Sequence, residues 1–264
     1  MQAEEYIRAG RLADALADLQ SRIRASPSDP RLRVFLFQLH CVLGNWDKAL
    51  TQLNLLADLG PENLLLAQLF RPVLTCEALR DEIFSGKRTP IIFGQPDEWI
   101  GLLIQANGHL AKGQFQAAAE LRDRAFEAAP AVAGNIDGQP FAWLADADTR
   151  LGPVLEVILE GCYRWVPFCR VKRIHFEKPA DLRDLVWLPA QFVWTNGGEA
   201  SGHIPTRYPL TERSSDDALR LARKTEWETQ QGDACIGLGQ RIFATDTAEY
   251  PMLECRLIDF APIV

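Results

Sequence analysis

The pattern AGRLADAL, residues 9–16, returns as LGNWDKAL at residues 43–50 and as KGQFQAAA at residues 112–119. In each copy a large apolar residue follows the glycine by two positions and an alanine follows it by five. A proline then stands 17 positions after each glycine, at Pro27, Pro61 and Pro130. Three copies with one spacing indicate an internal repeat, which decides the fold of this part of the chain.

This pattern resembles the tetratricopeptide repeat, a pair of antiparallel helices with a period of 34 residues. Gly10 and Gly44 are 34 positions apart, and Gly113 lies 69 positions beyond Gly44, close to two periods. The glycine permits a tight turn after the first helix, the alanine allows two helices to approach closely, and the proline ends the second helix. We therefore expect residues 1–130 to be helix pairs with a glycine inside each pair.

Stacked helix pairs form a curved solenoid, and its concave face is built from the first helix of each pair. A groove of this kind holds one short peptide or one helix of a partner protein. By helical spacing, the residues expected to line the groove are Arg31, Val34, Gln38, Leu103 and Asn107. The alternative is that several of them only pack the core or contact the rest of the chain.

Residues 131–264 have a different composition, because five of the seven tryptophans lie there. Strand patterns are predicted at residues 168–177, 185–195, 234–244 and 252–260, and helices at 151–160 and 214–223. The dipeptide Asn196-Gly197 is typical of a hairpin turn. The sequence therefore predicts two domains, all-α repeats at 1–130 and a small α+β domain with a mainly antiparallel sheet at 131–264.

The charge balance disfavours nucleic acid and anionic membranes as partners. Residues 1–130 carry 14 basic and 16 acidic side chains, and residues 131–264 carry 14 and 19. Neither part is basic, as a phosphate-binding surface would require. The first 19 residues include Glu4, Arg8 and Asp14 and lack the apolar stretch of a signal peptide, and no run reaches the length of a membrane span. We expect a cytoplasmic protein.

Sequence motifs for catalysis or for cofactor binding are mostly absent. There is no phosphate-binding loop and no nucleophile elbow. The best alternative is a metal-dependent hydrolase with a helical lid. Its candidate ligands are Asp146, Asp148, Asp184, His175 and His203. Their spacing matches no known metal motif, so we expect no catalytic, cofactor or metal site.

Arginine and aromatic side chains in the second half suggest another binding surface, because both types are favoured at interface hot spots. The alternative is that they pack the sheet against the helices. The candidate residues are Asp146, Asp148, Arg150, Trp165, Arg207, Tyr208 and Trp227.

An ordered set of short runs in the second half is similar to the ImpE/TagJ family, accessory proteins of bacterial type VI secretion. The runs are WLADADTRLGP (143–153), GCYRWVP (161–167), DLRDLVW (181–187), IPTRYP (204–209), ARKTEW (222–227) and GLGQR (237–241). The resemblance covers essentially the whole chain, since the family also begins with tetratricopeptide-like helices. It implies an adaptor that binds the N-terminal helix of the small contractile-sheath subunit and connects the sheath to the AAA+ ATPase that recycles it.

The six cysteines are expected to be free thiols, because a cytoplasmic compartment keeps thiols reduced and the sequence contains no CxxC pair. Thiol titration of freshly purified protein under denaturing, non-reducing conditions should therefore count six. A count of four or fewer, for instance through a bond between Cys162 and Cys169, would contradict this expectation.

Overall fold

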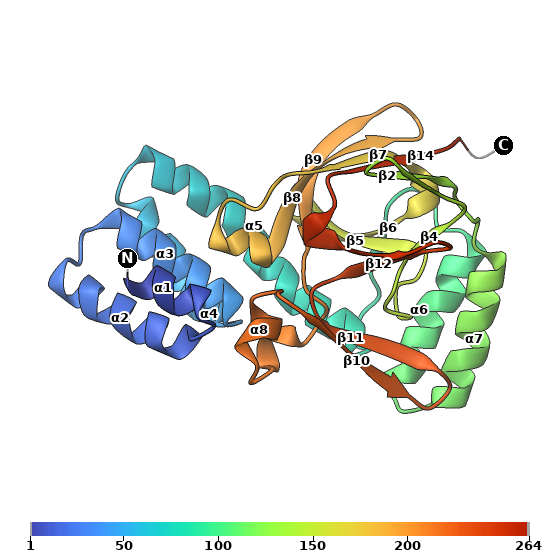
Figure 1. Ribbon diagram of the computed structural model, residues 1–264, viewed down its shortest axis with the longest axis horizontal. Coiled ribbons are helices and arrows are strands. Elements are labelled where there is room, and N and C mark those ends of the chain that lie inside the picture. Colours follow the sequence, from blue (N-terminus) through green and yellow to red (C-terminus); the bar gives the residue numbers. More distant parts are fainter. Residues whose placement is uncertain (1, 263–264) are drawn as a thin grey trace.

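The computed structural model describes residues 2–262, which form helices around a large sheet. Figure 1 shows the first two helix pairs on one side of the molecule, the sheet in the middle and a third helix pair on the opposite side. Helical repeats followed by a mainly antiparallel sheet confirm the predicted α+β class. Of the helices in this described part, none is both long enough and apolar enough to cross a membrane.

The first helices confirm the repeat prediction. Their bounds are α1 Gln2–Arg8, α2 Leu12–Ala25, α3 Pro30–Val42, α4 Trp46–Ala57 and α5 Pro61–Phe84. Gly10 lies between α1 and α2 with φ at 69°, and Gly44 lies between α3 and α4 with φ at 68°. A residue without Cβ adopts these left-handed angles at low cost, so the turn inside each pair depends on the glycine.

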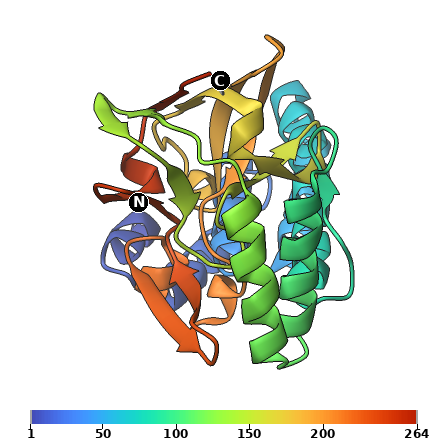
Figure 2. The ribbon, with the colours of Figure 1, turned by 90° about the vertical axis from the view of Figure 1, so that its right-hand side faces the viewer.

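A third helix pair, α6 Glu98–Leu110 and α7 Phe115–Ala128, contains Gly113 in its turn with φ at 72°. This pair does not continue the stack, because it lies across the sheet from α1–α4 (Figure 1), and Figure 2 shows its two helices side by side in front of the strands. Before α6 begins, β1 Ile91–Ile92 has already paired in parallel with the sheet strand β6. The expectation of a solenoid of three stacked repeats is therefore wrong.

Helix α5 belongs to both parts of the molecule, and Pro72 lies inside it without ending it. Phe70 packs on Trp187 of the sheet with ring centroids 6.1 Å apart, and Phe84 packs on Trp165 at 6.0 Å. One continuous set of buried apolar residues joins the helices to these strands. Residues 1–130 and 131–264 remain a proposed division into domains, and they share a core.

The large sheet has the strand order β1-β6-β5-β9-β8-β7-β14-β2-β3. Besides β1, its strands are β2 Gly134–Ile136, β3 Gln139–Phe141, β5 Val154–Leu159, β6 Cys162–Pro167, β7 Val171–Phe176, β8 Trp187–Trp194, β9 Glu199–Pro205 and β14 Leu257–Phe260. Apart from β1 with β6, the neighbours pair antiparallel. The predicted strands at 168–177 and 185–195 are confirmed by β7 and β8. The predicted turn at Asn196-Gly197 connects β8 to β9, with Gly197 at φ 84°.

The helix predicted at residues 151–160 is wrong, because this segment forms β5. The run VLEVIL is rich in β-branched and other large apolar residues, and all six side chains of β5 are buried. Gly152, with φ at 52°, and Pro153 precede the strand rather than begin a helix. A strand with both faces covered shows no alternation of apolar and polar residues, which is why it resembles a helix in the sequence.

The remaining strands form two small sheets, β13-β12-β4 and the hairpin β10-β11. Their bounds are β4 Leu144–Asp146, β10 Thr225–Gln230, β11 Ala234–Gly239, β12 Ile242–Thr245 and β13 Glu249–Pro251. The predicted strand 234–244 is thus divided between two sheets, and Gly239 at φ 92° ends its first part. The predicted strand 252–260 is shortened to β14, and the predicted helix 214–223 is shortened to α8 Asp217–Arg220, capped by Asp216.

The cysteines occupy different environments as free thiols. Cys41, Cys76 and Cys255 are buried, whereas Cys162 is exposed at the start of β6. Burial raises the pKa of Cys76 and of Cys255 to about 12. Since the thiolate is the reactive form, these two buried cysteines act as small apolar residues.

His40 gives the repeat part a defined response to acid. It is buried in α3, and burial, together with the nearby Lys48 charge, lowers its pKa to about 4. An unfolded histidine titrates near pH 6.5, so the unfolded chain binds a proton between about pH 6.5 and 4 that the folded chain does not bind. Stability is therefore lost as the pH falls through this window.

When the pH is lowered from 7.5 to 5.0, we predict that the wild type loses about 2 kcal/mol more of its free energy of unfolding than the variant His40→Gln does. Urea unfolding at both pH values measures this difference. His175→Gln, at an exposed position of β7, is the matched control and should follow the wild type. Equal pH dependence of all three proteins would contradict the assignment.

Candidate functional site

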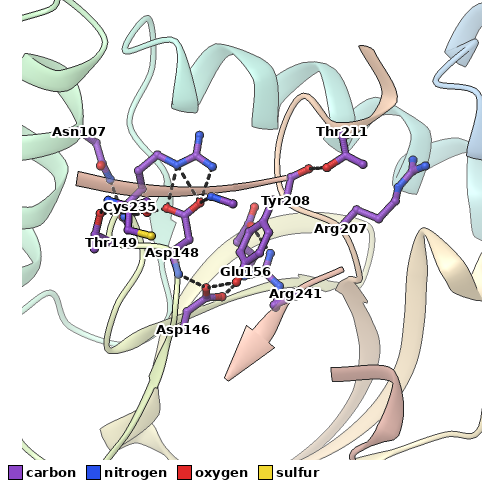
Figure 3. Close-up of polar contacts among 12 residues, drawn as sticks. Asn107, Asp146, Asp148, Thr149, Glu156, Arg207, Tyr208, Thr211, Cys235 and Arg241 are labelled. Carbon is purple, nitrogen blue, oxygen red and sulfur yellow. Dashed lines mark hydrogen bonds and ion pairs between the residues drawn. The ribbon is translucent and has the colours of Figure 1, made fainter. Parts of the chain in front are cut away.

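Most residues predicted to form a second binding surface lie inside the protein. Asp146, Asp148, Arg150, Trp165, Arg207 and Tyr208 are buried, and Trp227 is exposed. Figure 3 shows several of them converging between α5, the sheet and the segment that carries Tyr208. Except for Trp227, the expectation that they form a surface is wrong, because their polar groups are bound inside the protein: Asp148 pairs with Arg150, Asp146 pairs with Arg241, and Arg207 donates to backbone carbonyls.

Glu156, in the middle of β5, is the centre of this buried cluster and has no exposed surface. Arg80 of α5 donates two hydrogen bonds to it, from Nε to Oε1 at 2.6 Å and from Nη2 to Oε2 at 2.9 Å. Tyr163 donates its hydroxyl to Oε1 at 2.6 Å, and Arg241 forms an ion pair with Oε2. A bidentate arginine pair is among the strongest charge-assisted contacts, and here it joins helix to sheet.

Asp146, at the end of β4, forms a second buried ion pair with Arg241. Its Oδ1 accepts from the Tyr208 hydroxyl at 3.0 Å and from the Asp148 backbone N–H at 2.9 Å. The Tyr208 ring leaves no room over Gly237, where an added Cβ would lie 2.2 Å from the ring. This glycine, quoted in the run GLGQR, is therefore required for close packing.

Asp148 extends the cluster toward the third helix pair. It accepts two hydrogen bonds at 2.9 Å through Oδ1, from the backbone N–H and from the Nε of Arg150, and one at 2.9 Å through Oδ2, from the Gly237 N–H. The carbonyl of Arg150 in turn accepts from the Asn107 side chain of α6 at 2.7 Å. Asn107, expected to face a partner, thus holds α6 to this turn.

Electrostatics in the cluster follow from burial and pairing. Burial by itself raises the pKa of Glu156, but Arg80 and Arg241 outweigh this effect and lower it to about 2. The pKa of Asp146 is raised to about 6, mainly by burial. The charge of Arg241 lowers this pKa, and the like charge of Asp148 raises it. Their oxygens are already occupied by internal donors. A general base needs a free lone pair that reaches a substrate, and these carboxylates do not offer one.

A second set of arginine contacts holds the repeat helices from outside. Arg207 donates to the carbonyls of Val42, at the end of α3, and of Arg220, at 2.7 and 2.6 Å. Arg223 donates to the Ile7 carbonyl at the end of α1 at 2.8 Å. Carbonyls at helix ends lack partners within the helix, and guanidinium groups satisfy them favourably. Arg207 and Arg223, which follow β9 in the chain, therefore hold the α3–α4 turn and the α1–α2 turn in place.

The residues predicted to line the concave groove are distributed differently. Leu103 is fully buried, and Gln38, with 6% exposure, accepts the Leu182 N–H at 3.0 Å. Leu182 begins the 3-10 turn η2 Leu182–Leu185, which packs against α3. The expectation that Gln38 and Leu103 line an open groove is therefore wrong, whereas Asn107 is half-buried. Arg31 is exposed and Val34 is half-buried, so these two remain accessible.

The residues of the hydrolase alternative are not brought together. Asp184 accepts the N–H groups of Ala180 and Asp181 as a cap of η2, and His203 packs edge-on against Phe70. Asp146 and Asp148 are paired with arginines. Over residues 2–262 no group of three histidine, cysteine or acidic side chains is arranged to hold a metal ion.

Comparisons with known proteins agree with this architecture. Residues 138–259 match the family described as ImpE protein, and residues 6–69 match the tetratricopeptide repeat. The chain is 50% identical over 262 residues to the type VI secretion system accessory component TagJ of Pseudomonas aeruginosa, covering 99% of this chain and 92% of that protein. The chain belongs to the ImpE/TagJ family.

The fold is also present in an X-ray crystal structure of a protein from Vibrio parahaemolyticus. The TM-score is 0.90 at 26% sequence identity, and the match covers 99% of this chain and 98% of the other. The arrangement of helix pairs around the sheet is thus not particular to this sequence. This ImpE/TagJ chain therefore shares its three-dimensional fold with that protein.

Sequence reasoning missed the residues at the centre of the cluster, Arg80, Glu156 and Arg241, together with Glu77, which accepts the Trp187 indole N–H at 2.6 Å. One signal was available, because Glu156 interrupts the otherwise apolar run VLEVIL. A charged residue within a strand that is otherwise apolar indicates a buried and paired charge. The ImpE/TagJ runs quoted from the sequence surround this cluster, so much of their pattern is structural.

We predict that Glu156→Gln lowers the free energy of unfolding by about 3–5 kcal/mol at pH 7, because it leaves the buried Arg80 and Arg241 without their shared charge. Chemical denaturation monitored by tryptophan fluorescence measures the change. The control Glu160→Gln removes a charge at the exposed end of the same hairpin and should cost less than about 0.5 kcal/mol. Equal stability of both variants would contradict the central role of Glu156.

Proposed function

We propose that this chain is a cytoplasmic adaptor of a type VI secretion system that binds proteins and catalyses no reaction. It binds the N-terminal helix of the small contractile-sheath subunit and links the sheath to the AAA+ ATPase that recycles it. The observation that carries the proposal is the 50% identity, over nearly the whole chain, to a type VI secretion accessory component.

The architecture supports a role in which two partners are held at a fixed separation. Helical repeats bind peptides and helices of other proteins. Here the repeats are joined to the sheet through α5, the ion pairs of Glu156 and the arginine contacts to helix ends. An adaptor with one shared core transmits the position of one partner to the other without a flexible linker.

The buried charges support the absence of catalysis. The carboxylates of Asp146, Asp148 and Glu156 each accept hydrogen bonds from internal donors on both oxygens, and Tyr208 donates its hydroxyl to Asp146. Such a network stabilises the fold and orients the chain around it. Among the residues first proposed for partner binding, Arg31 and Val34 stay in the proposal as accessible positions of α3, and Trp227 stays as an exposed side chain of β10.

The adaptor role predicts that the full-length protein binds the small sheath subunit of its own organism and loses binding when that subunit lacks its N-terminal helix. Calorimetric titration should show a drop in affinity of at least about a hundredfold on deletion, since the helix supplies the main contact. Size-exclusion chromatography should also give a ternary complex with the ATPase.

A sheath subunit carrying an N-terminal helix of scrambled sequence is the matched control, because it keeps length and composition. Binding that survives the deletion or the scrambling would contradict the proposed partner segment. The absence of any binding to the intact subunit would overturn the adaptor role itself.

A further inference from the structure

The solvent side of α5 carries large apolar side chains that no residue within 2–262 covers. Leu65 is 67% exposed, Leu69 is 51% exposed and Leu64 is 41% exposed. Leu65, Leu69 and Pro72 are spaced i, i+4 and i+7, which places them on one face of the helix. We call Leu64, Leu65, Leu69 and Pro72 the α5 outer face. Helical repeats normally end in a polar outer face, so this apolar one is a departure.

A groove continues from this face toward the sheet. Its volume is 520 Å³, and its helix wall consists of Gln68, Leu69, Pro72 and Val73. The opposite wall comes from β5, β8 and β9, with Ile158, Pro189 and His203 among its residues. Figure 1 shows α5 leading from the repeat helices toward β8 and β9. Contiguous apolar surface of this kind marks an interaction site rather than scattered exposure.

The charged residues that line the groove, Glu160 and Glu177, are both acidic, and Glu62 lies exposed at the start of α5. Arg71, the cation nearest in sequence on α5, donates to Asn54 of α4 at 3.0 Å and so points toward the neighbouring helix. An occupant with lysine or arginine beside its apolar residues is complementary to this rim.

The geometry of the walls selects a helix rather than a strand as the occupant. β8 is an interior strand that pairs on both sides, with β7 and with β9. β9 pairs with β8 along its length and with β5 only at Gly202 and His203, so its free edge is short and is interrupted by this pairing. An added strand would need a longer continuous run of unpaired backbone groups. The floor and walls consist of side chains, and the apolar stripe of an amphipathic helix packs against such a surface.

We propose that the α5 outer face and the adjoining groove are the docking surface for an amphipathic helix of a partner protein, with apolar residues on one face and basic residues beside them. This inference rests on the proposed adaptor function and names the surface that serves it. Leu69 is the central anchor because it belongs both to the outer face and to the groove wall.

The test uses the full-length chain and three peptides. One is the N-terminal helix of the small sheath subunit, one is a designed helix with leucines at i, i+3, i+4 and i+7 and lysines elsewhere, and the third replaces those lysines by glutamates. Leu69→Glu should weaken the sheath and lysine helices by at least about tenfold in fluorescence anisotropy titrations. Ile91→Glu, at a side chain also 51% exposed but on β1, is the matched control and should change affinity by less than about twofold. Glu160→Lys should weaken the lysine helix and strengthen the glutamate helix.

The outcomes separate the surface from the adaptor role. If the lysine helix binds in a manner that depends on Leu69 and the sheath helix does not bind, the surface stands and the proposed function fails. If both helices bind Leu69→Glu as well as the wild type, the surface is wrong. If the wild type binds neither the sheath helix nor the lysine helix, the inference is overturned. The inference is also overturned if the wild type is a dimer that Leu69→Glu dissociates, because a second copy of the chain would then cover the α5 outer face.

Discussion

Arg80, near the C-terminal end of α5, reaches Glu156 in the centre of β5 through two charge-assisted hydrogen bonds, and Arg241 shares the same carboxylate. These charges lie where no water reaches them, so each is tolerated only while its partners are in place. The helix and the strand come from different halves of the chain. Their relative position is therefore part of the energetics of folding, and the repeats and the sheet form one structural unit.

Other contacts with the sheet and its loops hold the third helix pair away from the repeat stack. β1 joins the edge of the sheet before α6 begins, and Asn107 of α6 then binds the Arg150 carbonyl beside the ion pair of Asp148. The hairpin β10-β11 completes this side, because Arg122 of α7 donates to the Gly232 carbonyl at its tip at 2.8 Å. Repeat sequence alone does not determine a solenoid when a neighbouring sheet offers more extensive contacts.

Local signals in the sequence predicted local structure well. The spacing of Gly10, Gly44 and Gly113 identified the three inter-helix turns, because a left-handed turn leaves a glycine that can be recognised. Residues 151–160 were misassigned because a strand buried on both faces has no periodicity of its own. The candidate groove failed at Leu103 and Gln38 for another reason. Helical spacing shows which side of a helix faces inward, but only tertiary structure shows whether solvent or η2 lies there.

Pro72 and Gly161 meet where α5 passes the turn between β5 and β6, and an added Cβ on Gly161 would lie 2.6 Å from the proline. Gly161 also has φ at 72°, so both the contact and the turn exclude larger residues. The separation of the two groove walls is thus set before any ligand arrives. A preformed wall loses little conformational entropy on association. Among helices that carry the same apolar and charged side chains, differences in affinity would then come mainly from the entropy that each peptide loses in becoming helical.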